Sequence, residues 1–275
     1  MPYRLIVSDM DDTLLGEQGT LSPASLAAVR AVHDAGALFA LASGRMPCAM
    51  LSYARQLGIR VPMISYNGAE LVDPRTGEVL FQLPIQTPLA LELIRWCEVR
   101  GIHIQAYRND SFLTPSDNEF ARRYCASLRG LARMEVTDKP LSECVTWPQS
   151  KLLAILDPAH TPAVLAEVRK HFGSRLICAT SRPQYIEFTS PQAGKEQALA
   201  ELCRRLNIPS SEVIAFGDGQ NDVGMLRYAG LGYAMSNARE EVRRQIDHIA
   251  PSNREDGVAH VVMQLLHEGT IGKGA

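Results

Sequence analysis

The stretch Leu5-Ile6-Val7-Ser8-Asp9-Met10-Asp11-Asp12-Thr13-Leu14 sets the organisation of this chain, because a short apolar run ends abruptly in three acids. Residues 5–7 are typical of a buried strand in a parallel sheet. Acids that directly follow such a strand lie at the carboxyl edge of the sheet, where open α/β folds bind ligands. If the extended conformation continues, Asp9 and Asp11 point to the same side. Such a pair favours a divalent cation such as Mg²⁺, and an ordinary Asp-rich turn is the alternative.

The composition indicates a soluble globular protein, with 275 residues, of which 46% are hydrophobic and 21% charged. A formal net charge of −2 gives no electrostatic indication of a nucleic acid or an anionic membrane as partner. No apolar stretch approaches the roughly 20 residues of a membrane helix, and the N-terminus does not resemble a secretory signal. The six cysteines form no C-x-x-C pair. We therefore expect a cytoplasmic protein.

Helix and strand patterns alternate in the first part of the chain. Ser22 and Pro23 begin a helical pattern that Gly36 ends, residues 38–42 form a strand pattern, and a helix from about residue 46 to 57 leads to a third strand at 62–65. This β-α-β-α-β order predicts a parallel sheet with right-handed crossovers.

The pattern then changes to helices and adjacent strand pairs, and the α/β alternation returns near Ser190-Pro191. We expect an α/β fold whose Rossmann-like parallel-sheet core comprises residues 1–82 and 189–275, with an α+β domain inserted at residues 83–188.

A second acidic cluster, Gly217-Asp218-Gly219-Gln220-Asn221-Asp222, directly follows the apolar run 213–216. If this strand belongs to the same parallel sheet, Asp218 and Asp9 emerge at one edge. The alternative is a Gly/Asp turn in which Asn221 or Asp222 caps a helix.

Two further loops carry groups that suit a phosphate. Ser43 and Gly44 offer a hydroxyl and backbone N–H groups at the start of a helix. Lys195 lies in the first turn of its predicted helix, where the macrodipole disfavours a cation, so its place makes more sense with an anion nearby. A solvated lysine that tolerates the dipole is the alternative.

Taken together, these loops resemble the motifs of the haloacid dehalogenase-like superfamily. Asp9-Met10-Asp11-Asp12-Thr13 matches its D-x-D-x-T signature, and Ser43, Lys195 and the 217–222 cluster follow in the order of its other motifs. The large insertion, the pair Asn67-Gly68 and the late segment 252–258 resemble the Cof-type sugar-phosphatase branch.

The resemblance implies a Mg²⁺-dependent phosphatase in which Asp9 forms an aspartyl-phosphate and Asp11 is the general acid and base. Magnesium would bind Asp9, the Asp11 backbone carbonyl and Asp218, while Asp222 would orient waters or Lys195. The groups implied to bind the phosphoryl oxygens are the Met10 backbone N–H, Ser43, Gly44, Lys195 and Asn221. The role of Arg45 stays open. Residues 83–188 would form a cap domain, in which His103, Tyr107, Arg108 and Lys151 are more typical of an ordinary polar surface than of a ligand site.

The expected partner is a small-molecule phosphate ester, sugar phosphates first, with no nucleic acid or membrane partner and a monomer or weak homodimer. A phosphomutase or a dedicated disaccharide-phosphate phosphatase is an alternative within the resemblance. A regulatory protein that senses a phosphate ligand without turnover is a further alternative, although a pure binder has no evident need for Asp11.

Overall fold

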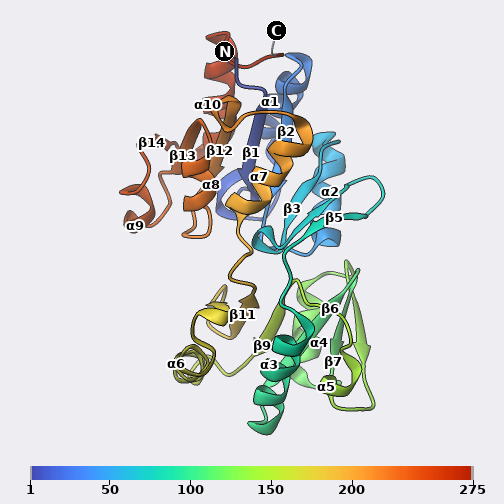
Figure 1. Cartoon of the computed structure of the whole chain (residues 1–275). Coiled ribbons are helices and arrows are strands. Elements are labelled where there is room, and N and C mark those ends of the chain that lie inside the picture. The colour runs from blue at the N-terminus through green and yellow to red at the C-terminus, as the bar shows by residue number, and fades with distance from the viewer. Residues whose placement is uncertain (1, 274–275) are drawn as a thin grey trace. The chain divides into compact units, whose positions relative to one another are not determined.

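The structure is a computed structural model that describes residues 2–273. These residues divide into two compact units, one formed by the chain up to Phe81 and from Gly194 onward, the other by Gln82–Ala193 (Figure 1). We propose that they correspond to the core and cap domains, for which the sequence places the boundaries at 82/83 and 188/189. Within residues 2–273, no helix is long and apolar enough to cross a bilayer.

The first unit is built on an eight-stranded sheet with the order β14-β13-β12-β1-β2-β3-β4-β5. Its strands are β1 (Leu5–Asp9), β2 (Leu38–Ala42), β3 (Met63–Ser65), β4 (Glu70–Val72), β5 (Val79–Gln82), β12 (Val213–Gly217), β13 (Leu231–Met235) and β14 (His248–Ala250). The pairings from β14 to β3 are parallel, and β4 runs antiparallel to β3. Leu5, Ile6 and Val7 are fully buried in the centre of this sheet. Burial of a side chain of this size contributes about 1.5–3 kcal/mol.

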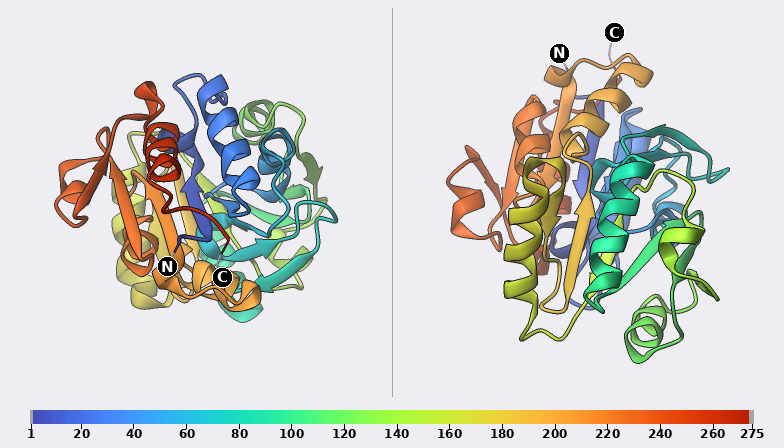
Figure 2. Two further views of the ribbon diagram at one scale, coloured as in Figure 1. Left: turned by 90° about the horizontal axis from the view of Figure 1, so that it is seen from above. Right: turned by 60° about the horizontal axis from the view of Figure 1, so that its bottom comes forward.

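Helices cover both faces of this sheet. One face is covered by α1 (Pro23–Asp34), α2 (Pro47–Leu57) and α10 (Gly257–His267), and the other by α7 (Lys195–Leu206) and α8 (Val223–Tyr228) (Figure 2). A short helix, α9 (Glu240–Arg243), precedes β14. The Ser22 hydroxyl caps α1 by accepting the Ser25 N–H at 2.9 Å, and Pro23 begins the helix. This is the helix start that the sequence predicts.

The second unit has its own six-stranded sheet, with the order β10-β11-β9-β6-β7-β8, and its own apolar core. The strands are β6 (His103–Arg108), β7 (Ser111–Thr114), β8 (Arg133–Val136), β9 (Leu152–Ile155), β10 (Ile177–Ala179) and β11 (Tyr185–Thr189), and the helices are α3 (Thr87–Val99), α4 (Glu119–Ser127), α5 (Leu141–Cys144) and α6 (Thr161–Phe172). All of its pairings are antiparallel except that of β7 with β8. The predicted fold class, a parallel-sheet α/β core with an inserted α+β domain, is confirmed.

Candidate active site

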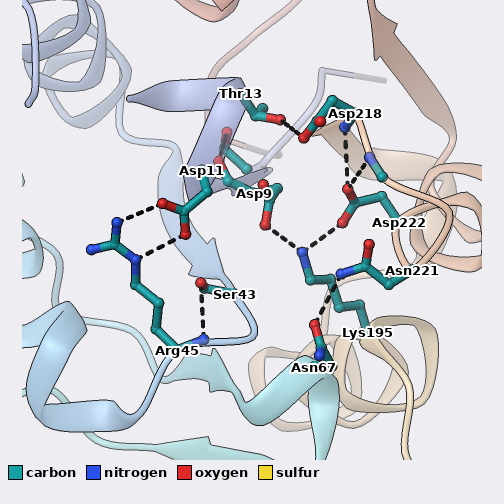
Figure 3. Close-up of polar contacts among 12 residues, drawn as sticks. Asp9, Asp11, Thr13, Ser43, Arg45, Asn67, Lys195, Asp218, Asn221 and Asp222 are labelled. Atoms are coloured by element: carbon teal, nitrogen blue, oxygen red, sulfur yellow. Dashed lines mark hydrogen bonds and ion pairs between the residues drawn. The ribbon is translucent and has the colours of Figure 1, made fainter. Parts of the chain in front are cut away.

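The residues singled out from the core motifs lie at one edge of the first sheet. β1 pairs in parallel with both β2 and β12, so the carboxyl ends of these three strands are adjacent. Asp9 ends β1, Ser43 follows β2 and Asp218 follows β12. The side chains from these loops converge with those at the start of α7 (Figure 3).

Lys195 is the buried centre of this group. Its ammonium donates to the carboxylates of Asp9 and Asp222, with the Asp222 Oδ1 at 2.6 Å. Only 1% of Lys195 is exposed, although it is the first residue of α7, where the helix dipole disfavours a cation. Two carboxylates in direct contact outweigh that dipole penalty, which is at most about 1 kcal/mol. The carboxylates of Asp9 and Asp222 therefore supply the nearby anion that the position of Lys195 predicts.

Burial and charge shift the protonation of this group. Burial raises the pKa of the Asp9 carboxyl well above its ordinary value; the Lys195 ammonium opposes this shift and the Asp222 carboxylate adds to it. Burial alone would lower the pKa of the Lys195 ammonium, but Asp222 and Asp9 hold that pKa above its ordinary value. The two carboxylates thus favour the charged form of Lys195, which is in contact with Asp9.

Asp218 completes an acidic cluster with Asp9 and Asp222. Each of the three can place one carboxylate oxygen within 4.8 Å of the others. Burial and the nearby Asp222 raise the pKa of Asp218 to about 6, against the hydrogen bond that it accepts from Thr13 at 2.9 Å. Carboxylates that lie this close disfavour each other's charged form, as the raised pKa of Asp218 indicates, and a cation would offset this repulsion. Hard oxygen ligands suit Mg²⁺. The donor set therefore fits a divalent cation.

Asp222 also holds its own loop in shape. Its Oδ2 accepts the backbone N–H groups of Asp218 at 3.1 Å and Gly219 at 2.8 Å, while its Oδ1 accepts from Lys195. Both oxygens are used by these contacts, which ties the 217–222 loop to the start of α7.

Asp11 lies in the turn that directly follows β1. β1 ends at Asp9, and the chain enters an irregular turn, Met10–Leu14, in which Asp11 is extended at φ −72° and Asp12 is left-handed at φ 56°. The regular strand therefore does not continue through Asp11, so the condition on which the common side of Asp9 and Asp11 was predicted is not met. Asp11 instead accepts two hydrogen bonds from Arg45, at 2.8 and 2.5 Å. Arg45 also lies over the Tyr53 ring, 5.2 Å from its centroid.

The remaining predicted phosphate-binding residues surround this group. Met10 is fully buried, and the buried Ser43 hydroxyl accepts the Arg45 backbone N–H at 3.2 Å. A Cβ at Gly44 would lie 2.9 Å from the Asn67 Oδ1, so the Asn67 side chain lies close over this glycine. Asn221 is exposed and donates to that same Oδ1 at 2.9 Å.

Sequence reasoning missed two members of the site. The sequence assigns no role to Arg45, because its pairing with Asp11 becomes evident only when β1 and β2 lie side by side. Asn67 entered only as part of a family resemblance, and its contact with Asn221 joins loops that are 154 positions apart. No local sequence signal identifies either contact.

The chain matches the sequence pattern of the haloacid dehalogenase-like hydrolases over residues 6–262. Among curated proteins, it is 29% identical to the phosphatase YwpJ of Bacillus subtilis, with 96% of this chain and all of that protein covered. It is 30% identical to the 5-amino-6-(5-phospho-D-ribitylamino)uracil phosphatase YcsE of the same organism, with 94% of each chain covered.

Solved structures agree with this match. A haloacid dehalogenase-like hydrolase from Bacteroides thetaiotaomicron superposes with a TM-score of 0.85 at 27% identity, with 96% of this chain and 99% of that one covered. A Thermotoga maritima protein superposes with a TM-score of 0.84 at 30% identity, with coverages of 95% and 97%. The expected resemblance is confirmed, as is the expectation of an enzyme of the phosphatase class. The chain belongs to the haloacid dehalogenase-like hydrolases.

Proposed function

We propose that this enzyme is a Mg²⁺-dependent phosphatase that hydrolyses small phosphorylated metabolites, sugar phosphates first, through an aspartyl-phosphate at Asp9. The observation that carries this proposal is the Asp9 carboxylate at the sheet edge, in contact with the buried Lys195 and beside Asp218 and Asp222. A carboxylate that is held by an ammonium group, beside carboxylates that suit a divalent cation, is suited to attack phosphorus.

The reaction consists of two displacements. An Asp9 oxygen forms a bond to phosphorus as the bond to the ester oxygen breaks, and Asp11 gives its proton to that leaving oxygen. Water then attacks the phosphorus, Asp11 takes a proton from it, and the Asp9 carboxylate is released with inorganic phosphate. In the structure Arg45 donates to both Asp11 oxygens, so Asp11 has to release Arg45 and take up a proton from solvent before the first step.

The phosphoryl oxygens would be bound by the Ser43 hydroxyl, the Lys195 ammonium and the Asn221 amide, together with the backbone N–H groups of Met10 and Gly44. Asp9, Asp218 and the Asp11 backbone carbonyl would hold the Mg²⁺, and Asp222 would keep Lys195 in place. When bound, the cation offsets the repulsion between carboxylate and phosphate and polarises the phosphoryl group.

Two curated relatives carry names that specify phosphorylated metabolites, the ribitylaminouracil phosphatase above and a pyridoxal phosphate phosphatase of Escherichia coli that is 26% identical over 97% of this chain. Both support a small phosphorylated metabolite as substrate. We expect the enzyme to act in the cytoplasm as a monomer or weak homodimer. No disulfide joins its six cysteines, all of which the structure describes.

The test is phosphate release from a panel of hexose phosphates, the ribitylaminouracil phosphate, pyridoxal phosphate and p-nitrophenyl phosphate, with and without Mg²⁺. We expect Mg²⁺-dependent release, and almost none from folded Asp9→Asn or Asp11→Asn variants. Substantial activity of Asp9→Asn would refute the covalent mechanism. Isomerised hexose phosphate without free phosphate would favour the mutase, and binding without turnover would favour the sensor.

A further inference from the structure

The turn Tyr66–Gly68, which directly follows β3, has a backbone that needs an explanation. All three of its residues have positive φ, at 49°, 57° and 93°. The left-handed region is unfavourable for a residue with a side chain, and two such residues in succession before a glycine store strain that the surrounding structure must balance. Strain of this kind is found where a fixed geometry is needed for function.

The first contact of this turn is with the loop after β2. The Asn67 N–H donates to the Ser43 carbonyl at 3.0 Å, and the Tyr66 N–H donates to the Arg45 carbonyl at 3.1 Å. The Asn67 side chain lies over Gly44 so closely that a Cβ there would be 2.9 Å from its Oδ1. The turn therefore fixes the backbone of the loop that carries Ser43 and Gly44.

The second contact is with the start of α7. A Cβ at Gly68 would lie 2.1 Å from the Gly194 carbonyl oxygen and 2.6 Å from the Lys195 nitrogen. The bare backbone of Gly68 therefore packs directly on the residues that present the Lys195 ammonium to Asp9.

The third contact is made by a side chain. The Asn67 Oδ1 accepts a hydrogen bond of 2.9 Å from the Nδ2 of Asn221, whose own side chain is exposed (Figure 3). An exposed asparagine samples several rotamers unless a partner selects one. The left-handed conformation of Asn67 is what brings its carboxamide beside that of Asn221.

We propose that Tyr66–Gly68 is the element that aligns the three phosphate-binding loops, and that Asn67 is a positioning residue that acts on phosphate through Asn221. The proposal rests on the proposed function, because Asn221 is there assigned to the phosphoryl oxygens. Asn67 itself transfers no proton and forms no covalent bond. It selects the Asn221 rotamer that meets the phosphoryl group.

The test separates the side chain of Asn67 from its backbone. Glycine adopts positive φ without strain, so Asn67→Gly removes the hydrogen bond and keeps the turn. The readout is the dissociation constant of inorganic phosphate in the presence of Mg²⁺, measured by calorimetry, with kcat and KM measured beside it. Loss of one hydrogen bond predicts phosphate binding about 2- to 10-fold weaker, with the thermal midpoint close to that of the wild type.

A double-mutant cycle with Asn221→Ala tests whether Asn67 acts on phosphate through Asn221. Once Asn221 is truncated, Asn67→Gly is expected to weaken phosphate binding by less than twofold further. Asn207 supplies the matched control, because it is a left-handed asparagine, at φ 52°, that caps the other end of α7. Asn207→Gly is expected to bind phosphate as the wild type does.

Phosphate binding by Asn67→Gly at the wild-type level would overturn the proposal. An undiminished effect of Asn67→Gly in the Asn221→Ala background would overturn the route through Asn221. A wild-type chain that releases no phosphate from any ester would instead refute the proposed function, and the calorimetric comparison would remain valid. The two failures are therefore distinguishable.

Discussion

Replacement of Lys195 by methionine is the most informative perturbation of this site. Methionine has nearly the same length and fills the buried space, but it removes the positive charge that contacts Asp9 and Asp222. The buried carboxylates of Asp9 and Asp222 then lie near each other and near the half-buried Asp218 without a compensating cation. The variant isolates the electrostatic contribution of one ammonium group.

The expected loss is large because the ion pair is buried. Removal of one partner of a buried pair typically costs about 3–5 kcal/mol, since the other charge is left uncompensated. Exposed ion pairs contribute at most about 1 kcal/mol. Arg75 provides the control, because it forms two hydrogen bonds with Asp73 in an exposed hairpin. Lys195→Met should therefore lower the free energy of unfolding several times more than Arg75→Met.

The loss should also depend on pH in a definite direction. Burial raises the pKa of Asp9 in the folded chain, and without Lys195 nothing on the described residues lowers it again to the same extent. Above the ordinary pKa of an aspartate, about 4, the folded chain then binds more protons than the unfolded chain, so its stability falls as the pH rises. The defect of Lys195→Met should be small near pH 5 and large near pH 8.

The assay is urea unfolding followed by circular dichroism, in EDTA, at both pH values. Partial recovery on addition of Mg²⁺ is expected, because the cation replaces the missing positive charge. A loss below about 1 kcal/mol at pH 8, or a loss that is equal at pH 5 and pH 8, would refute the reasoning.

Three further predictions concern the same edge of the sheet. Magnesium affinity should increase as the pH rises from 5 to 7, since the pKa of Asp218 is raised to about 6 and a ligand must be ionised; a flat calorimetric profile would contradict this. Asp218→Asn should raise the Mg²⁺ concentration for half-maximal activity at least about tenfold without loss of stability, because it removes a half-buried acid; an unchanged requirement would exclude Asp218 as a ligand. Gly68→Ala should lower the free energy of unfolding by about 1–3 kcal/mol, because the new Cβ would meet the Gly194 backbone. Gly77→Ala is the control and should lower it less, because Gly77 also has a positive φ, 73°, but lies in open space. Equal losses of free energy would show that φ alone determines the effect.

The sheet edge could be predicted from the sequence because its signals are local. Residues 5–7 and 213–216 are short apolar runs that each end in acids, and both became central, fully buried strands. Two such strands bring their acids together when they are neighbours in a parallel sheet, as β1 and β12 are. Lys195 could be placed for a similar reason, since a cation in the first turn of a helix is locally unfavourable.

Other parts could not be predicted because their causes are not local. The strands β8 (Arg133–Val136) and β14 (His248–Ala250) are partly exposed and have only four and three residues, so that even the alternation of polar and apolar residues in β8 is too short to predict a strand. The ion pair of Asp11 with Arg45 depends on the turn that begins at Met10, which the strand pattern does not indicate. The pair Asn67-Gly68 is typical of any tight turn. The contacts of that turn with the Ser43 loop become evident only when β3 packs beside β2.

The central claim is that Asp9 forms a covalent intermediate, and the stereochemistry at phosphorus tests it most directly. A phosphate ester made chiral with oxygen isotopes would be hydrolysed by the wild-type enzyme, and the configuration of the released phosphate determined. Two in-line displacements, the first by Asp9 and the second by water, predict net retention of configuration. Net inversion would mean that water attacks the ester directly, and it would contradict the assignment of Asp9 as the nucleophile.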